Sequence, residues 1–186
     1  MSKLLQARIG VGGRFVADAW LEFAADADLA TLAGSAGILV SYADWIERRA
    51  LLLTLERPLG VRVGGADDLD ALAPDLSRLA LVAVDFPAFT DGRGYSVARL
   101  LRERYGYLGE LRAVGDVLRD QVFYLLRCGF DSLALREDQD ESGALAALTD
   151  FREVYQAAID RPTPLYQRRA AALAALAAAP TSTEIA

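Results

Sequence analysis

Apolar and polar residues divide the chain into two alternating kinds of segment. Five short stretches rich in valine, leucine and isoleucine, at 38–42, 60–64, 79–86, 110–115 and 132–137, are flanked by glycine or charged residues. Such continuous apolar runs predict buried strands of a parallel sheet. Elsewhere the apolar positions recur every three or four residues, which predicts helices at about 44–56, 67–77, 94–105, 117–128 and 141–158.

The alternation of strands and helices predicts an α/β fold. Successive strand–helix units imply right-handed crossovers and a mainly parallel sheet of about five units. A complete eight-unit barrel takes about 250 residues, so two arrangements stay open for a chain of 186 residues. One is a partial TIM-barrel-like sheet, which the uniform unit length slightly favours, and the other is an open doubly wound sheet with helices on both faces.

We expect one domain over residues 1–186, with three regions. Residues 1–37 form a short β-rich N-terminal segment, in which "GVGG" predicts a turn and "RFVADAWLEF" a strand. Residues 38–160 hold the strand–helix repeats. Residues 161–186 are predicted to form an alanine-rich helix and a frayed tail.

The composition excludes several classes of function. The chain has no histidine and a single cysteine, Cys128, which rules out a histidine-based triad, an internal disulfide, and histidine or four-cysteine metal sites within one chain. The net charge of -6 argues against general binding to nucleic acid. No apolar stretch reaches about 18 residues, so we expect a cytoplasmic protein without a membrane span, and we expect no metal site.

The stretch "DGRGYS" follows a predicted strand and begins a predicted helix. Segments that follow the strands of a parallel sheet gather at one edge, where ligands bind. Gly92 and Gly94 permit backbone angles that turn N–H groups towards one point, Ser96 adds a hydroxyl, and Arg93 offers a planar guanidinium. The stretch therefore predicts an anion site, although it also fits a tight turn in which Asp91 caps the backbone and Arg93 lies in solvent.

The helix after this stretch supplies further candidates. Tyr95, Arg99 and Arg102 follow one another at helical spacing, on a face other than the predicted apolar stripe. The commoner explanation for such a face is an ion-paired surface, here with Glu103 one turn after Arg99. A ligand role requires convergence with the next loop.

That loop reads "GDVLRD" and follows the next predicted strand. Its acidic residues either cap the helix and pair with arginines or take part in proton transfer. The complete set of candidate ligand-binding residues is Asp91, Gly92, Arg93, Gly94, Tyr95, Ser96, Arg99, Arg102, Gly115, Asp116, Arg119 and Asp120.

The block 85–135 contains "DGRGYSVARLLR", "GELRAVGDVLRDQ" and "RCGFD" in order. With these motifs the chain resembles a bacterial family of unknown function that is described as oxidoreductases of sulfite reduction. The genes of that family commonly accompany those of assimilatory sulfite reductase. The resemblance implies a role in sulfur assimilation and cysteine biosynthesis, with sulfite reductase as a partner, but it identifies neither a cofactor nor catalytic residues.

Three hypotheses follow from these observations. The first is an accessory protein of assimilatory sulfite reduction that binds a small anion or the sulfite reductase through its Arg/Gly-rich edge. The second is a small α/β enzyme that acts on an anionic metabolite, with Asp85, Asp116 or Asp120 as acid–base groups. The third is a scaffold that forms homo-oligomers through the alanine-rich helix or a sheet edge. Whether the chain is an enzyme stays open.

Overall fold

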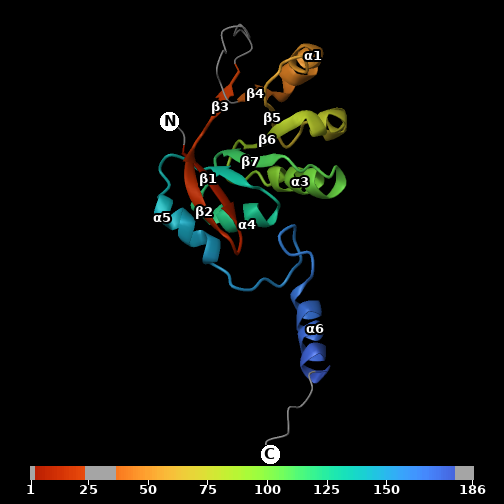
Figure 1. Cartoon of the computed structure of the whole chain (residues 1–186). Coiled ribbons are helices and arrows are strands. Elements are labelled where there is room, and N and C mark those ends of the chain that lie inside the picture. Colours follow the sequence, from red (N-terminus) through yellow and green to blue (C-terminus); the bar gives the residue numbers. More distant parts are fainter. Residues whose placement is uncertain (1–2, 24–36, 179–186) are drawn as a thin grey trace, which may run out of the picture.

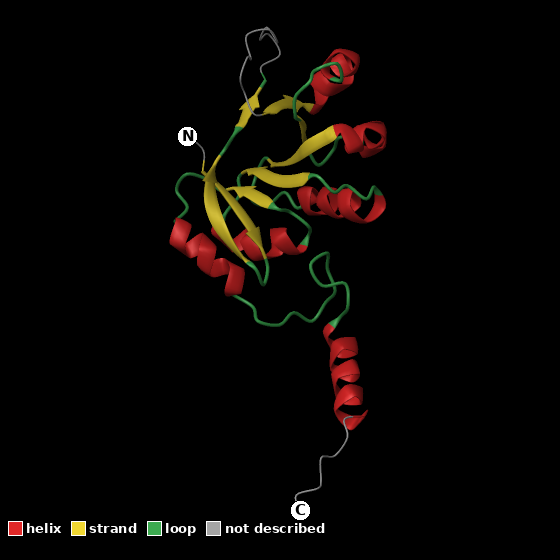
Figure 2. Cartoon of the chain, in the orientation of Figure 1, coloured by secondary structure: helices red, strands yellow, loops and turns green. Residues whose placement is uncertain are grey.

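The computed structural model describes residues 3–23 and 37–178, which form a mixed α/β fold. Figure 1 shows the arrangement, and Figure 2 separates helices from strands. The strands are β1 (Lys3–Arg8), β2 (Gly12–Ala17), β3 (Trp20–Glu22), β4 (Gly37–Ser41), β5 (Leu59–Val63), β6 (Leu79–Phe86), β7 (Glu110–Gly115) and β8 (Ser132–Ala134). The helices are α1 (Tyr42–Leu52), α2 (Leu69–Leu72), α3 (Arg93–Arg99), α4 (Val122–Arg127), α5 (Glu141–Ala146) and α6 (Leu165–Ala178).

The described strands form one sheet of eight strands in the order β2-β1-β8-β7-β6-β5-β4-β3. All five predicted strands are present, as β4 to β8, and they pair in parallel. The expectation of about five units undercounts the sheet, because the N-terminal segment contributes three more strands. The single strand predicted over "RFVADAWLEF" is in fact two strands, β2 and β3, and β1 was not predicted. β2 is largely exposed and β3 has three residues, so neither forms a continuous apolar run.

The sheet is a curled half-barrel, which decides between the two predicted arrangements. Strands β3 to β8 lie side by side in chain order. Right-handed crossovers that always advance in one direction place their helices on a single face of the sheet. Figure 1 shows α1 and α3 together on that face. The opposite face is therefore the inner face of the curl, and the predicted N-terminal β segment lies at its edges.

The two outermost strands of the sheet are consecutive in the chain. β2 and β3 stand at opposite ends of the strand order, and only Asp18 and Ala19 separate them. β2 pairs with β1, whereas β3 pairs with β4. The segment from β2 to β3 consequently spans the opening between the two edges of the curl and brings Asp18 over the inner face.

The main core lies between the sheet and the helices. It includes alternate strand residues such as Val61, Val82 and Leu111, together with Trp45 of α1 and Leu101 after α3. Their full burial stabilises the layered arrangement, at about 25 cal/mol for each Å² of apolar surface removed from water. The residues between them on β5, β6 and β7 point to the inner face.

The last helix of the predicted strand–helix repeats ends much earlier than its sequence pattern indicates. α5 and a following 3₁₀ turn stop at Thr149, whereas the prediction continued to 158. Arg127 at the end of α4 explains the difference, because its guanidinium donates to the carbonyl of Gln156 at 2.6 Å and to the carboxylate of Asp160 at 3.3 Å. The backbone of Ile159 also donates to the carbonyl of Arg127. These tertiary hydrogen bonds replace helical ones in this segment.

The alanine-rich helix α6 extends away from the rest of the molecule (Figure 2). It contains no buried residue. No helix in the described ranges is both long and apolar enough to span a membrane.

Candidate functional site

The predicted "DGRG" turn is a local ion-paired turn. Arg93 donates to Asp91 from Nε at 3.0 Å and from Nη2 at 2.6 Å, and the backbone N–H of Arg93 donates to the same carboxylate. These hydrogen bonds lower the pKa of Asp91 to about 2. Gly92 and Gly94 both avoid positive φ, and Gly94 packs against the ring of Phe86, where a Cβ would overlap it. The glycines therefore serve close packing and the turn, in contrast to the predicted cradle of N–H groups.

Residues of α3 divide between core and surface. Tyr95 packs edge-on against Phe86, and its hydroxyl accepts a hydrogen bond from Gln121 at 3.1 Å. Burial raises the pKa of the Tyr95 hydroxyl. Ser96 is exposed, and Arg99 forms a surface ion pair with Glu103 at 2.8 Å. The ion-paired interpretation of this face holds for Arg99.

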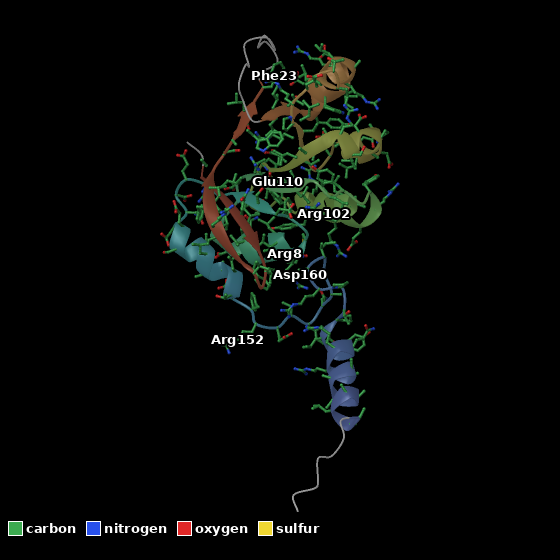
Figure 3. The ribbon with its side chains drawn as sticks, viewed as in Figure 1. Arg8, Phe23, Arg102, Glu110, Arg152 and Asp160 are labelled. Atoms are coloured by element: carbon green, nitrogen blue, oxygen red, sulfur yellow. The ribbon has the colours of Figure 1, made fainter. Side chains whose placement is uncertain are left out.

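Arg102 lies at the opposite end of the sheet from the predicted edge. Its guanidinium donates to the carbonyls of Tyr107, Gly109 and Gly129 at 2.6, 3.0 and 2.9 Å, and to the carboxylate of Asp131. These partners precede β7 and β8, so Arg102 ties together the amino ends of two strands. Figure 3 labels Arg102 and also Glu110, the first residue of β7.

Arg119 and Asp120 face the α5 segment. Arg119 donates to Asp150 at 2.9 Å and to the carbonyl of Gly143 at 3.4 Å, and it contacts Asp120 at 3.4 Å. Arg93, Arg99, Arg102 and Arg119 therefore have four separate sets of partners and do not converge. Of the predicted set, Gly115 and Asp116 lie at the carboxyl edge of the inner face.

A cavity of about 710 Å³ opens at this edge, and we call it the carboxyl-edge cavity. Residues at or near the carboxyl ends of β3, β5, β7 and β8 line it, and this edge is where ligands bind in both barrel and open α/β folds. The residues that line it are Asp18, Trp20, Leu21, Glu22, Leu39, Arg62, Arg112, Val114, Gly115, Ala134, Leu135, Arg136 and Glu137.

Gly115 shapes one side of the cavity. Its φ of 96° is left-handed, and a Cβ at this position would overlap the carbonyl oxygen of Phe86. The resulting turn lets the backbone N–H of Asp116 donate to that carbonyl at 2.7 Å. The ends of β6 and β7 are thereby fixed against each other. Asp116 does not cap the following helix as predicted, because its carboxylate accepts from the N–H of Phe89 at 2.8 Å.

Arg62 projects from β5 towards the cavity. Its Nε donates to the Asp85 carboxylate at 3.2 Å, and Nη2 donates to the same oxygen. Its Nη1 donates to Glu22 of β3 at 3.1 Å. Asp85 belongs to the end of β6, so Arg62 links β5 to its neighbour β6 and, across β4, to β3.

Arg136 forms a similar arrangement on the other side. It donates from Nη1 to Asp116 at 2.8 Å, and from Nε and Nη2 to Asp138 at 2.7 and 2.8 Å. These carboxylates raise the pKa of Arg136, and the same bonds lower the pKa of Asp138. Arg62 and Arg136 thus each hold one carboxylate at the end of a strand and one more exposed carboxylate.

Arg112 lies at the floor of the cavity and is almost completely buried. Its Nη1 donates to both oxygens of Asp18 at 2.9 Å, and its Nη2 donates to Glu110 at 2.8 Å. Ser132 also donates to Glu110. A buried guanidinium requires such a complete set of acceptors, and the Asp18 contact ties the β2–β3 segment to the floor.

Trp20 provides an apolar wall beside the arginines. Its ring lies over Gly37 and Gly60, where added Cβ atoms would approach it to 2.6 and 3.1 Å. It packs with Leu39 and with the other inner-face residues Leu81 and Ala83. The carboxyl-edge cavity therefore combines guanidinium groups with an aromatic surface.

Other reactive groups lie elsewhere. Cys128 is buried at the end of α4, and burial raises the pKa of its thiol. Within residues 3–23 and 37–178, no cluster of three or more histidine, cysteine, aspartate or glutamate side chains is placed to hold a metal ion.

Two of the cavity residues that the sequence analysis did not select, Arg62 and Arg112, could have been found from the sequence. Arg62 interrupts "GVRVG" and Arg112 interrupts "ELRAVG", so each places a charge inside an apolar strand. Alternation along a strand puts such a residue on the face opposite its apolar neighbours. Asp18 and Trp20 had no comparable signal, because their position depends on the path of the β2–β3 segment.

Comparison with known proteins gives one family. No curated protein matches the sequence. The family described as "Bacterial protein of unknown function (DUF934)" matches residues 60–166, which include all but the first residue of β5, strands β6 to β8, helices α2 to α5 and all of the arginines discussed above. Because this match covers more than half of the chain, the protein belongs to the DUF934 family.

Proposed function

We propose that the chain is an accessory protein of assimilatory sulfite reduction and that it binds a small anion in the carboxyl-edge cavity. The observation that carries the proposal is the convergence of Arg62, Arg112 and Arg136 on one cavity at the carboxyl ends of parallel strands. The pathway role rests on the resemblance in residues 85–135 to proteins associated with sulfite reduction. An oxyanion accepts hydrogen bonds from a guanidinium in the same geometry as a carboxylate.

Arg62 and Arg136 each have one carboxylate that an incoming anion can replace. The side chain of Glu22 is 71% exposed and that of Asp138 is 57% exposed. Ion pairs at such exposure contribute at most about 1 kcal/mol, so their replacement costs little. Asp85 and Asp116 are more protected and hold the two guanidinium groups in place during the exchange.

Arg112 has a different role in this proposal. Its bonds to Asp18 and Glu110 already satisfy its guanidinium. Its charge offsets part of the negative charge that these two carboxylates place at the floor of the cavity. Arg112 therefore holds the floor in place and is not itself a ligand for the anion.

Isothermal titration calorimetry with sulfite, sulfate and phosphate tests the binding step. We expect binding to the wild-type protein and a loss of at least tenfold in affinity for Arg62→Gln and Arg136→Gln. Arg93→Gln is the matched control, because Arg93 is an exposed arginine whose carboxylate partner lies outside the cavity. Equal loss in all three variants would indicate nonspecific screening, and the cavity assignment would fail.

Growth on different sulfur sources tests the pathway role. Deletion of the gene should impair growth on sulfate but leave growth on cysteine unchanged. Complementation with Arg93→Gln should restore growth, whereas Arg62→Gln should not. Equal growth of the deletion strain on both sulfur sources would refute the role in sulfite reduction.

A second candidate function is an enzyme that acts on an anionic metabolite. The cavity favours it because carboxylates and arginines meet there, as such a reaction requires. Asp85 and Asp116 contact lining arginines, whereas Asp120 is absent from the lining and pairs with Arg119. Asp85→Asn separates the candidates: an enzyme would lose complementation while retaining anion binding, whereas a binding protein would lose or retain both together.

A further inference from the structure

The carboxyl-edge cavity is much larger than an inorganic oxyanion requires. Its volume of about 710 Å³ falls within the range of about 300–1,000 Å³ that is usual for organic ligands. Part of the remaining lining is apolar and comes from Trp20, Leu39, Val114 and Leu135. A sulfite-sized ion would leave this apolar surface facing water.

The ring of Trp20 packs directly against the backbone of two glycines in the sheet. Gly37 on β4 and Gly60 on β5 leave room for the indole, and any side chain at Gly37 would collide with it. Glycine inside a strand weakens the strand relative to alanine. Two such residues on neighbouring strands place a partly buried aromatic ring at the cavity wall.

The ring and the exchangeable anion position lie on the same strand. Trp20 and Glu22 are two residues apart on β3, so their side chains point to the same face of the sheet. Their backbones are separated by about 7 Å along the strand. The Glu22 carboxylate occupies the position on Arg62 that a ligand anion would take. A ligand with an acidic group attached to a flat ring spans this separation.

We propose that the carboxyl-edge cavity binds an organic anion with an aromatic or conjugated ring. The ring packs against Trp20, and the acidic group replaces Glu22 on Arg62. This inference rests on the proposed anion-binding role of the cavity, and it adds the chemical class of the ligand. Stacking on an aromatic side chain contributes enough to distinguish such a ligand from its ring-free counterpart.

Benzenesulfonate and methanesulfonate test the proposal, because they share the acidic group and differ in the ring. Calorimetry on the wild-type protein should give at least tenfold tighter binding for benzenesulfonate. In Trp20→Leu the two affinities should agree within about twofold. Trp20→Phe retains an aromatic ring against Gly37 and Gly60 and should keep most of the preference for benzenesulfonate. This variant also shows whether a change at position 20 disturbs the fold.

Fluorescence supplies a second measurement that leaves Trp20 intact. The chain contains two tryptophans, Trp20 and Trp45, and Trp45 is fully buried in the main core. In Trp45→Phe the emission therefore comes from Trp20 alone. Benzenesulfonate should change its intensity or wavelength with the same dissociation constant as in calorimetry, whereas methanesulfonate should have little effect.

Any other outcome of these experiments refutes a specific part of the proposal. If the two sulfonates bind equally to the wild type, the ring position is refuted and the small-anion proposal stands. If benzenesulfonate is preferred but Trp20→Leu keeps the preference and the emission of Trp20 does not change, the ring binds elsewhere and the proposal is refuted. If neither sulfonates nor sulfite bind, both proposals fall.

Discussion

Replacement of Arg112 tests whether the inner face of the sheet is held together by its ion pairs. Arg112→Met removes the guanidinium but keeps much of the side-chain length, so the carboxylates of Asp18 and Glu110 lose their shared partner. The side chain of Arg112 is 2% exposed, whereas those of Asp18 and Glu110 are 26% and 24% exposed. Removal of one member of a buried ion pair costs about 3–5 kcal/mol. Because both carboxylates can be partly rehydrated, we expect about 3 kcal/mol.

Urea unfolding followed by circular dichroism measures this effect. With a slope of about 2 kcal/mol per molar urea, the midpoint should fall by about 1.5 M. Arg119→Met is the matched control, because the Arg119 side chain is 37% exposed, against 2% for Arg112, and its ion pairs should contribute less than about 1 kcal/mol. A midpoint for Arg112→Met within about 0.3 M of the wild type would refute the reasoning, since the contact between Asp18 and the floor would then contribute nothing measurable.

Three further predictions follow from local geometry. Gly115→Ala should lower stability by about 2 kcal/mol or more, measured by thermal unfolding, because it combines a left-handed φ with a backbone overlap, whereas Gly92→Ala at φ of -81° should have little effect. NMR titration should give Asp91 a pKa of about 2, and Arg93→Gln should raise it towards 3.8. The Asp91–Arg93 contribution to stability should therefore be complete above the unfolded pKa and disappear as the pH falls towards 2. Cys128 should react with a thiol reagent far more slowly in the native protein than in urea, because burial both covers it and raises its thiol pKa; equal rates would contradict its burial.

The parallel strands of the sheet could be predicted because each of them is visible in the sequence as a short run of apolar residues. Val82 and Val84, for example, belong to a continuous apolar run that a fully buried strand requires. Gly129 after α4 has a φ of 102°, the left-handed conformation in which glycine typically ends a helix. Strands β1 to β3 carry a weaker signal, because β2 is largely exposed, β3 has only three residues, and the second partner of β1 is the distant strand β8.

The candidate site was harder to predict for a physical reason. An arginine side chain is long enough to find a carboxylate or a carbonyl wherever its backbone is placed. Arg102 illustrates this, because it reaches three carbonyls at the amino ends of strands although it follows a helix that begins at the carboxyl edge. The strand arginines Arg62 and Arg112 are more constrained, since the pleat fixes which face they occupy.

The pairing of β1 with β8 sets an order for folding during synthesis. Leu4, Leu5 and Gln6 find their second partners at residues 132–134, so one side of the β1–β2 hairpin stays unpaired until residue 134 has been synthesised. Contacts between such distant residues slow folding, because the long intervening loop must close first. Until then β1 and β7 each have an unpaired edge, which is where a chaperone or another chain would bind first.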